Sequence, residues 1–191
     1  MDSKLQIISG KYKGRRLVVP QNARPTQNMA RIALFNMLES GIVNDLADNL
    51  VVWDAFAGSG ALGLECLSRY TSARVFFTDV APESIKVIRE NLEKLNVGAM
   101  AQVLQIDAVA AVKQYANTAN LVFVDAPYSL ADLGRTVVKK LGQLAQVGTI
   151  VVWEQDAKDS VDADLNVWNV LRDKVYGRAR FMILQKQNKI A

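Results

Sequence analysis

The stretch VVWDAFAGSGALG, from Val51 to Gly63, decides the fold. Its first part is apolar and β-branched and closes on Asp54, which predicts a buried strand. A glycine-rich turn follows, and the run Ala61–Arg69 predicts a helix. A strand, a glycine turn and a helix N-terminus together are a common cradle for a nucleotide-like cofactor. From Leu50 onward strand and helix patterns alternate, which predicts an α/β domain with a mostly parallel sheet.

The glycines of this turn do not identify the cofactor by themselves. Gly58, Gly60 and Gly63 also match the G-x-G-x-x-G pattern of dinucleotide-binding proteins. Asp54 favours S-adenosylmethionine, because a carboxylate facing the turn would repel a pyrophosphate and attract the cationic ammonium and sulfonium of the methyl donor. The alternatives are a nicotinamide or flavin cofactor, or a glycine turn that only lets helix and strand pack closely.

Two further acids follow the next two expected strands. Arg74–Thr78 leads to Asp79, nineteen residues after Gly60, where a carboxylate could accept hydrogen bonds from both ribose hydroxyls. Ala101–Ile106 leads to Asp107, which could accept from the adenine amino group. Each acid taken singly could equally be a helix cap. The residues expected to bind the cofactor are Asp54, Phe56, Gly58, Gly60, Asp79, Val80, Asp107, Ala108 and Asp125.

The fourth expected strand, Asn120–Val124, leads into Asp125, Ala126, Pro127 and Tyr128. These four residues resemble the Asp/Asn-Pro-Pro-Tyr/Phe motif of methyltransferases that modify exocyclic amines of bases. The Asp125 carboxylate and the Ala126 carbonyl would accept the two amine protons and turn the lone pair toward the methyl group. Tyr128 would stack on the extruded base. We therefore expect all four residues in the catalytic site, although Asp-Ala-Pro-Tyr alone could be an ordinary turn after a strand.

Composition limits the class of protein. The 191-residue chain is 50% hydrophobic, enough for one domain with a substantial core. It contains no apolar run of membrane length and no secretory start, so we expect no membrane partner and a cytoplasmic location. Its single cysteine, Cys66, forms no intrachain disulfide and is expected to be buried. The absence of histidine removes the commonest general base and metal ligand, so we expect a mechanism without metal.

Positive charge gathers at the two ends of the chain. Residues 1–31 contain seven Lys or Arg against one acid and residues 172–191 contain six against one, whereas residues 32–171 contain ten against seventeen. This distribution is typical of a protein that binds a polyanion, and a solubilising surface is the alternative. Leu5–Ile8 and Leu17–Val19 predict two short strands of a hairpin whose basic tip would grip phosphate.

The remaining elements are predicted from periodicity. Three more strands are expected at Thr149–Trp153, Val167–Arg172 and Phe181–Leu184. The last should be antiparallel, because only a short turn at Tyr176–Gly177 separates it from its predecessor. Apolar stripes near 84–95 and 130–144 predict helices that cover the sheet. We divide the chain into a basic hairpin extension with a linker, residues 1–25, and a domain, residues 26–191.

Seven segments spread along the chain form a pattern together. They are IISGKYKGRRL at Ile7–Leu17, RPT at Arg24–Thr26, LFN at Leu34–Asn36, FAGSGALGLE at Phe56–Glu65, LSR at Leu67–Arg69, ENLEKL at Glu90–Leu95 and VYG at Val175–Gly177. With them the chain resembles the RsmD-type 16S ribosomal RNA guanine-N2 methyltransferases of bacteria, nearly end to end. FAGSGALGLE followed by LSR is the most specific part of the resemblance.

The resemblance implies a class I, Rossmann-like methyltransferase domain with seven strands and an N-terminal β-hairpin that contacts RNA. It also implies S-adenosylmethionine as the cofactor and, as the substrate, the N2 amine of a guanine in 16S rRNA within the small ribosomal subunit. We expect a monomer. The residues expected to contact RNA are Lys11, Lys13, Arg15, Arg16, Arg24, Thr26 and Arg31.

Three positions depart from the usual sequence of that family. Ala126 stands where proline is usual, Asn28 where an acid is usual, and Ile32 where Glu is usual. Without proline the φ angle of the catalytic turn is no longer fixed, although the Ala126 carbonyl remains. The other two changes remove negative charge beside Arg24 and Arg31.

Three other functions stay open. A DNA adenine-N6 or cytosine-N4 methyltransferase would use the same chemistry, but the chain lacks a separate target-recognition domain. A catalytically silent RNA-binding assembly factor would keep the fold and explain the three departures. The glutamine methylases of release factors use a similar motif after the fourth strand. An enzyme that acts on a protein has little need of a basic hairpin, which argues against this function.

Overall fold

A seven-stranded sheet in the order β3-β2-β1-β4-β5-β7-β6 forms the centre of the molecule. The computed structural model describes residues 5–20, 28–159 and 165–188. The strands are β1 (Val51–Asp54), β2 (Arg74–Asp79), β3 (Ala101–Gln105), β4 (Leu121–Val124), β5 (Ile150–Asp156), β6 (Trp168–Tyr176) and β7 (Ala179–Lys186). The α-helices are α1 (Asn28–Met37), α2 (Ala61–Arg69), α3 (Pro82–Leu95), α4 (Ala108–Tyr115) and α5 (Ala131–Leu144).

Strands β1 to β5 pair in parallel, and β7 is antiparallel to both β5 and β6. The mostly parallel sheet and the antiparallel last strand confirm the prediction. The C-terminal strands are longer than predicted, since β5 continues to Asp156 and β6 to Tyr176. The extra residues are polar or exposed, so hydrophobic patterning could not detect them, but pairing with β7 keeps them in the ladder.

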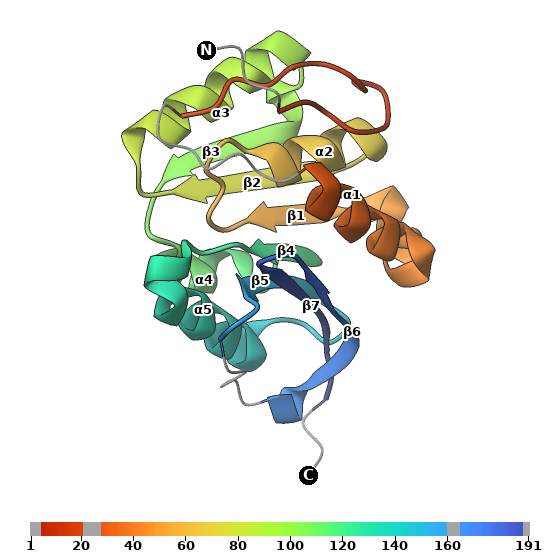
Figure 1. Ribbon diagram of the computed structural model, residues 1–191, viewed down its shortest axis with the longest axis vertical. Coiled ribbons are helices and arrows are strands. Elements are labelled where there is room, and N and C mark those ends of the chain that lie inside the picture. The colour runs from red at the N-terminus through yellow and green to blue at the C-terminus, as the bar shows by residue number, and fades with distance from the viewer. Residues whose placement is uncertain (1–4, 21–27, 160–164, 189–191) are drawn as a thin grey trace.

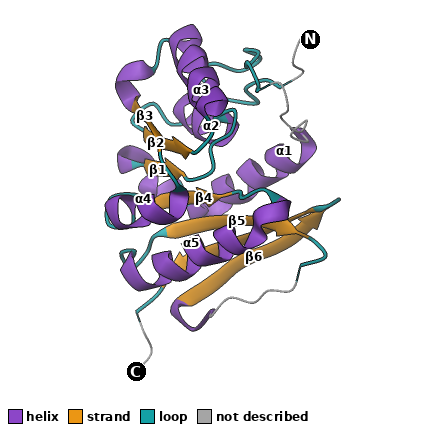
Figure 2. Ribbon diagram, turned by 90° about the vertical axis from the view of Figure 1, so that its left-hand side faces the viewer, coloured by secondary structure: helices purple, strands orange, loops and turns teal. Residues whose placement is uncertain are grey.

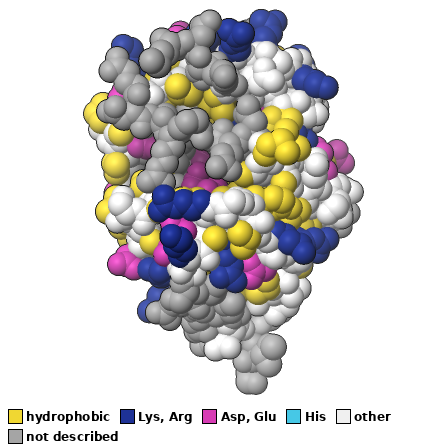
Figure 3. Space-filling model, viewed as in Figure 1, with side chains coloured by type: hydrophobic (Ala, Val, Ile, Leu, Met, Phe, Trp, Pro, Cys, Tyr) yellow, Lys and Arg dark blue, Asp and Glu magenta, His cyan; other side chains and the backbone are white. Residues whose placement is uncertain are grey.

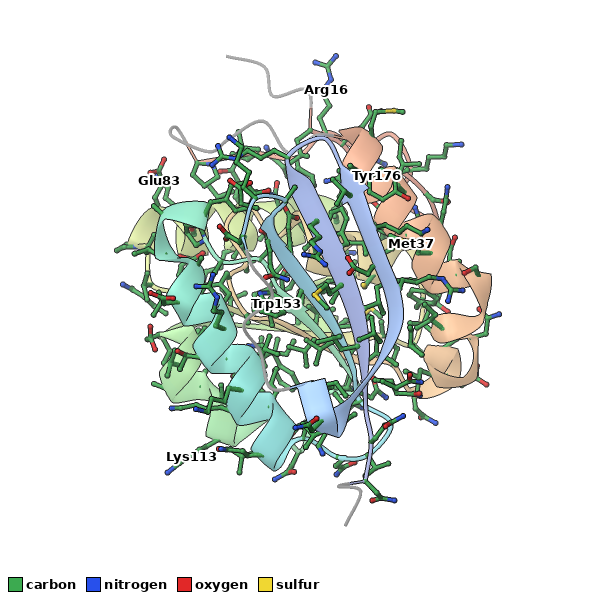
Figure 4. The ribbon with its side chains drawn as sticks, turned by 60° about the horizontal axis from the view of Figure 1, so that its bottom comes forward. Arg16, Met37, Glu83, Lys113, Trp153 and Tyr176 are labelled. Carbon is green, nitrogen blue, oxygen red and sulfur yellow. The ribbon has the colours of Figure 1, made fainter. Side chains whose placement is uncertain are left out.

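Helices cover both faces of the sheet because successive strand residues point to opposite sides. On one face Val52, Phe77 and Phe123 pack into a core that includes side chains of α1, α2 and α3. On the other, Trp53 and Trp153 pack with side chains of α4 and α5. Figures 1 and 2 show these two groups of helices on opposite sides of the strands. In Figure 4 Trp153 lies on the α5 side and Met37 of α1 on the other.

The N-terminal segment forms a hairpin, but its two predicted strands are not formed. Gln6 and Arg16 make an isolated antiparallel bridge instead. Backbone hydrogen bonds cross the hairpin from the Ile7 amide to Arg15 and from the Leu17 amide to Leu5. The following Ile8 and Ser9 amides donate instead to the fully buried Glu65 carboxylate of α2, at 2.8 and 2.9 Å. The hairpin therefore packs along α2 rather than extending away from the domain.

The hairpin also contributes to the core. Leu5, Ile7 and Leu17 are buried in the same cluster as the side chains of α1 to α3. The division at residue 25 remains a prediction, but residues 5–20 share a core with the rest of the chain. Cys66 of α2 is buried, as expected. No helix within the described ranges is long and apolar enough to cross a membrane.

Two glycines allow the turn after β1 to form. Gly60 has φ +77°, a left-handed conformation that glycine adopts at little cost, and it immediately precedes α2. Gly63 lies against β2, where an added Cβ would come within 2.3 Å of the Phe77 ring. These residues bring the first turn of α2 directly onto the end of β1.

Candidate functional site

The candidate site lies where the order of the sheet reverses, between β1 and β4. Crevices at the carboxyl ends of strands at such a point are the usual ligand sites of open α/β sheets. Asp54 ends β1 and pairs in register with Phe123 of β4, two residues before Asp125. The glycine turn and the Asp125–Tyr128 motif, about 60 residues apart in sequence, are thus neighbours at one edge of the sheet.

Asp54 is 2% exposed, and its carboxylate accepts a hydrogen bond from the Gly63 amide at 3.1 Å. Burial raises the pKa of Asp54 to about 7, the Gly63 hydrogen bond opposes this shift, and the nearby Asp79 adds to it. The carboxyl thus ties the end of β1 to the first turn of α2. A cationic group placed beside it would favour the ionised form.

Asp79 holds the glycine turn from the neighbouring strand. Its two carboxylate oxygens accept hydrogen bonds from the Gly58 and Ala81 amides, both at 2.8 Å. Each oxygen can accept a further bond. Apart from its chain neighbours, no group of the described residues lies within 4 Å of the position that a Cβ on Gly58 would take, so this part of the turn is open on the described part of the surface. A ligand with hydroxyl groups therefore fits here.

The other residues expected to hold the cofactor surround this turn or follow β3. Val80 is exposed and Phe56 is half-buried, whereas Ala108 is buried in the first turn of α4. Asp107 caps α4, since its side chain accepts a hydrogen bond from the Ala110 amide at 3.0 Å. Asp107 is therefore the N-terminal cap of α4, which was one of the two roles considered for it. Its contact with adenine stays a prediction.

The Asp125–Tyr128 motif leaves β4 and enters α5 through a short 3₁₀ turn. Asp125 is half-buried, Ala126 is buried, and Pro127 is exposed. Tyr128 is half-buried, and its hydroxyl donates a hydrogen bond to the Glu154 carboxylate at 2.8 Å. Burial and this carboxylate both raise the pKa of Tyr128 above its ordinary value. Burial likewise raises the pKa of Glu154.

Three side chains around Tyr128 were not expected from the sequence. Glu154 is one, and Arg178 is the second, with its guanidinium carbon 4.8 Å from the centre of the Tyr128 ring. Asp156 is the third, and it accepts a hydrogen bond from the Arg178 Nε at 2.6 Å. The sequence did contain a signal for Glu154. It is an acid directly after the apolar residues of the fifth strand, just as the expected site residues follow the apolar residues of the first four.

The expected RNA-binding residues divide into three groups. Lys11, Lys13, Arg15 and Arg16 are exposed on the hairpin, as an RNA contact requires. Arg24 and Thr26 lie outside the described residues. Arg31 is only 1% exposed and donates to the Gln6 carbonyl, and burial lowers its pKa. We therefore correct the expectation for Arg31: its side chain attaches α1 to the N-terminal segment and presents no surface to RNA.

The hairpin approaches the site only with its C-terminal arm. Its tip packs at the far end of α2, where the Lys11 amide donates to the Ser68 carbonyl at 2.7 Å. A nine-residue helix is about 13 Å long, so the tip lies roughly that far from the glycine turn. The Asn91 side-chain amide donates to the Val18 carbonyl of the C-terminal arm and to the Ser59 carbonyl of the glycine turn, so it links the two. Figure 4 shows Arg16 at the same end of the molecule as Glu83, at the start of α3.

Comparison with known proteins identifies the family. The family model described as Conserved hypothetical protein 95 matches residues 5–185. Ribosomal RNA small subunit methyltransferase D of Escherichia coli (strain K12) is 35% identical over 187 residues, covering 96% of this chain and 90% of the relative. The chain belongs to the RsmD-type methyltransferase family. The family resemblance seen in the sequence is thereby confirmed.

Solved structures agree with this membership. The structure of yhhF from Escherichia coli has a TM-score of 0.75 and 33% identity, covering 95% of this chain and 97% of that one. An RNA methyltransferase from Salinibacter ruber, solved with S-adenosyl-L-homocysteine, has a TM-score of 0.64 and 20% identity, with 88% and 97% covered. The second comparison supports the fold alone. The class I, Rossmann-like fold expected of an RsmD-type protein is confirmed.

Proposed function

We propose that this protein transfers a methyl group from S-adenosylmethionine to the N2 amine of a guanine in 16S rRNA of the small ribosomal subunit. The observation that carries the proposal is the meeting of the glycine turn and the Asp125–Tyr128 motif at the switch between β1 and β4. The name of the Escherichia coli relative supports ribosomal RNA of the small subunit as the substrate. The guanine N2 position rests on the resemblance found in the sequence.

The described residues fit the cofactor. The open space over Gly58 and the acids at the ends of β1 and β2 suit a ligand with a cationic end and free hydroxyls. Asp54 and Asp79 would hold it from the turn, and Asp107 from the start of α4. When bound, S-adenosylmethionine supplies an electrophilic methyl group.

The residues after β4 would prepare the nucleophile. The lone pair of a guanine amine is delocalised into the ring, so the free amine is a poor nucleophile. Hydrogen bonds from its two protons to the Asp125 carboxylate and the Ala126 carbonyl would localise that lone pair and aim it. Ala126 is buried, which holds its carbonyl in place without the usual proline. Most of the rate gain would come from proximity and orientation.

Proton removal needs no strong base in this scheme. The methylated nitrogen carries a positive charge, so it loses a proton readily to water or to a carboxylate. This suits a chain without histidine. Lys11, Lys13, Arg15 and Arg16 would bind phosphates some distance from the target base, and the protein would act as a monomer in the cytoplasm.

The proposal is tested by methyl transfer to small subunits purified from cells that lack the modification. The RNA is digested and the modified nucleoside identified by mass, and N2-methylguanosine is the expected product. N6-methyladenosine or N4-methylcytosine would replace the guanine assignment. No incorporation, with S-adenosylmethionine still bound, would favour a silent assembly factor.

The hairpin is tested through the salt dependence of RNA binding. Replacing Lys13 and Arg15 by alanine should reduce the slope of log K against log salt by about 0.7–0.9 for each phosphate that the protein no longer neutralises. The matched control replaces Lys113 and Lys139, exposed lysines of α4 and α5 on the other face of the sheet. An equal change in both double variants would mean that the hairpin has no special role in RNA binding.

A further inference from the structure

The basic C-terminal segment has no role in the function proposed so far. Its position follows from the register of the sheet. Asp156, the last residue of β5, pairs with Ala179, the first residue of the antiparallel β7. The turn between β6 and β7 therefore lies at the carboxyl edge of the parallel strands, where the candidate site is. The Ala157 amide fastens the turn by donating to the Arg178 carbonyl at 2.8 Å.

Arg178 reaches from this turn onto the ring of Tyr128. Its side chain is 60% exposed and is held by Asp156, which lies at the end of β5. The guanidinium keeps the pKa of Asp156 below its usual value. A guanidinium 4.8 Å from a ring centre is within the range of a cation–π contact. Arg178 thus covers one face of the ring on which the target base is expected to stack.

Glu154 contacts the hydroxyl group of the same Tyr128 ring. Val124 of β4 pairs with Trp153 of β5, so Asp125 and Glu154 follow these partners side by side. The Tyr128 hydroxyl donates to Glu154 at 2.8 Å. Ala126, Tyr128, Glu154 and Asp156 line one small pocket. The ring is therefore restrained at its hydroxyl and at one face by two segments that the Asp125–Tyr128 motif does not include.

We propose that Glu154 and Arg178 are positioning residues that hold Tyr128 for the target base, which makes the β6–β7 turn part of the RNA site. Glu154 fixes the direction of the ring through the hydroxyl. Arg178 lies over one face of the ring and limits its tilt, so that the ring is held at the position where the target base is expected to stack. This inference rests on the proposed function. It adds a basic contact at the reacting base, whereas the tip of the N-terminal hairpin lies at the far end of α2.

Glu154 is tested by a double-mutant cycle with Tyr128. We expect Glu154→Ala to lower kcat about tenfold, with KM for small subunits changed less than threefold. Glu154→Gln should restore most of the rate, because its amide oxygen still accepts the hydrogen bond. In a Tyr128→Phe background, Glu154→Ala should have no further effect on kcat. Multiplicative effects of the two changes would show that Glu154 does not act through the hydroxyl, and would overturn its part of the proposal.

Arg178 is tested against Arg172, an exposed arginine on the same hairpin. Arg178→Ala should lower kcat about tenfold and raise KM, and Arg178→Lys should restore KM but not kcat, because an ammonium lacks the planar group that stacks on a ring. Arg172→Ala should leave kcat unchanged. Equal kcat losses for Arg178→Ala and Arg172→Ala would reduce Arg178 to general electrostatic attraction and overturn the proposal.

These outcomes are separable from failure of the proposed function. The rate is measured as methyl incorporated into RNA, whichever nucleoside receives it, so a different product changes the function and leaves the cycle valid. A second readout needs no turnover: the Tyr128 ring signal in spectra of protein with ¹³C-labelled tyrosine, assigned with Tyr128→Phe. Glu154→Ala and Arg178→Ala should each shift this signal, and Arg172→Ala should not. An unmoved signal in the first two variants would overturn the proposal even in an inactive protein.

Discussion

The two halves of the site are built by different means. In the cofactor half, the carboxylates of Asp54, Asp79 and Asp107 accept hydrogen bonds from backbone amides of the loops and helix turns that follow the strands. In the substrate half, Tyr128 and its neighbours bond side chain to side chain across 22 to 26 residues of sequence. In the first half the bonds to Asp54 and Asp107 and the Ala81 bond to Asp79 span at most nine residues, and only the Gly58 bond to Asp79 spans 21. The side-chain pairs of the second half exist only once β5 has paired with β4 and β7.

Because the two halves are built differently, we expect variants of one half to affect cofactor binding and variants of the other to affect the rate of methyl transfer. Basic and acidic side chains lie interspersed near the middle of the face seen in Figure 3. Changes in the cofactor half should alter stability and cofactor affinity together, because the carboxylates that hold the backbone are also the ones proposed to bind the cofactor. Changes in the substrate half should alter the rate and leave the fold intact. The predictions below test this separation.

The largest effect is expected at Asp125, where the two halves meet. Asp125→Ala should lower the rate of methyl transfer about 1000-fold, since a lost group that orients charge in the transition state costs that much in other enzymes. The dissociation constant for S-adenosylmethionine should change less than about tenfold, because the other acids remain. Single-turnover rates and equilibrium dialysis measure the two quantities.

A conservative variant of Asp125 provides the control. Asp125→Asn keeps one oxygen acceptor and should lose less activity than Asp125→Ala. If Asp125→Ala weakened cofactor binding as much as it slowed transfer, Asp125 would belong to the cofactor half. Cofactor binding and methyl transfer would then not be separable at Asp125.

The next effect is a pH dependence that comes from Asp54. Its pKa is raised from 3.8 to about 7 in the folded protein, so between these values the folded state keeps a proton that the unfolded state has released. Stability contributed by this group is therefore present below about pH 4 and lost as pH rises through 7, by on the order of 4 kcal/mol. Asp54→Asn should remove this loss, because an amide does not ionise.

Denaturant unfolding of both proteins without cofactor, from pH 4 to pH 8, measures the Asp54 contribution as the difference between them. A difference independent of pH would mean that Asp54 ionises normally. Cofactor binding provides an independent check. The affinity for S-adenosylmethionine should rise up to about pH 7 in the original protein, since a cation favours the carboxylate. In Asp54→Asn this rise should disappear.

The sequence predicted the cofactor half well because its signals are local. The glycine turn, the acid after each strand and the first-turn Pro82 of α3 each occupy a few adjacent residues, and each lies where the pattern placed it. The seven-stranded, mostly parallel sheet and its antiparallel last strand agreed with the prediction as well. What these acids do for a cofactor is still a prediction, because the backbone contacts seen here suit a structural role too.

The rest could not be predicted because it depends on contacts between distant segments. Arg178 comes to Tyr128 only through the register of β5 with β7, which hydrophobic patterning does not specify. Arg31 looked like part of a basic surface, yet tertiary packing buries it against the N-terminal segment. The extent of the hairpin pairing also depends on a distant segment, since the Ile8 and Ser9 amides bond Glu65 on α2.

The smallest effect is predicted at Asp107, where two variants distinguish a helix cap from a cofactor ligand. Asp107→Ala should destabilise the protein by about 1 kcal/mol through loss of the α4 cap. Asp107→Ser can still cap the helix, so its free energy of unfolding should stay within about 0.5 kcal/mol of the original, while removal of the adenine hydrogen bond should weaken cofactor binding about tenfold. Calorimetry of cofactor binding together with denaturant unfolding measures both. If Asp107→Ser bound the cofactor as tightly as the original protein, the acid after β3 would be a cap only, and the cofactor half would rest on Asp54 and Asp79.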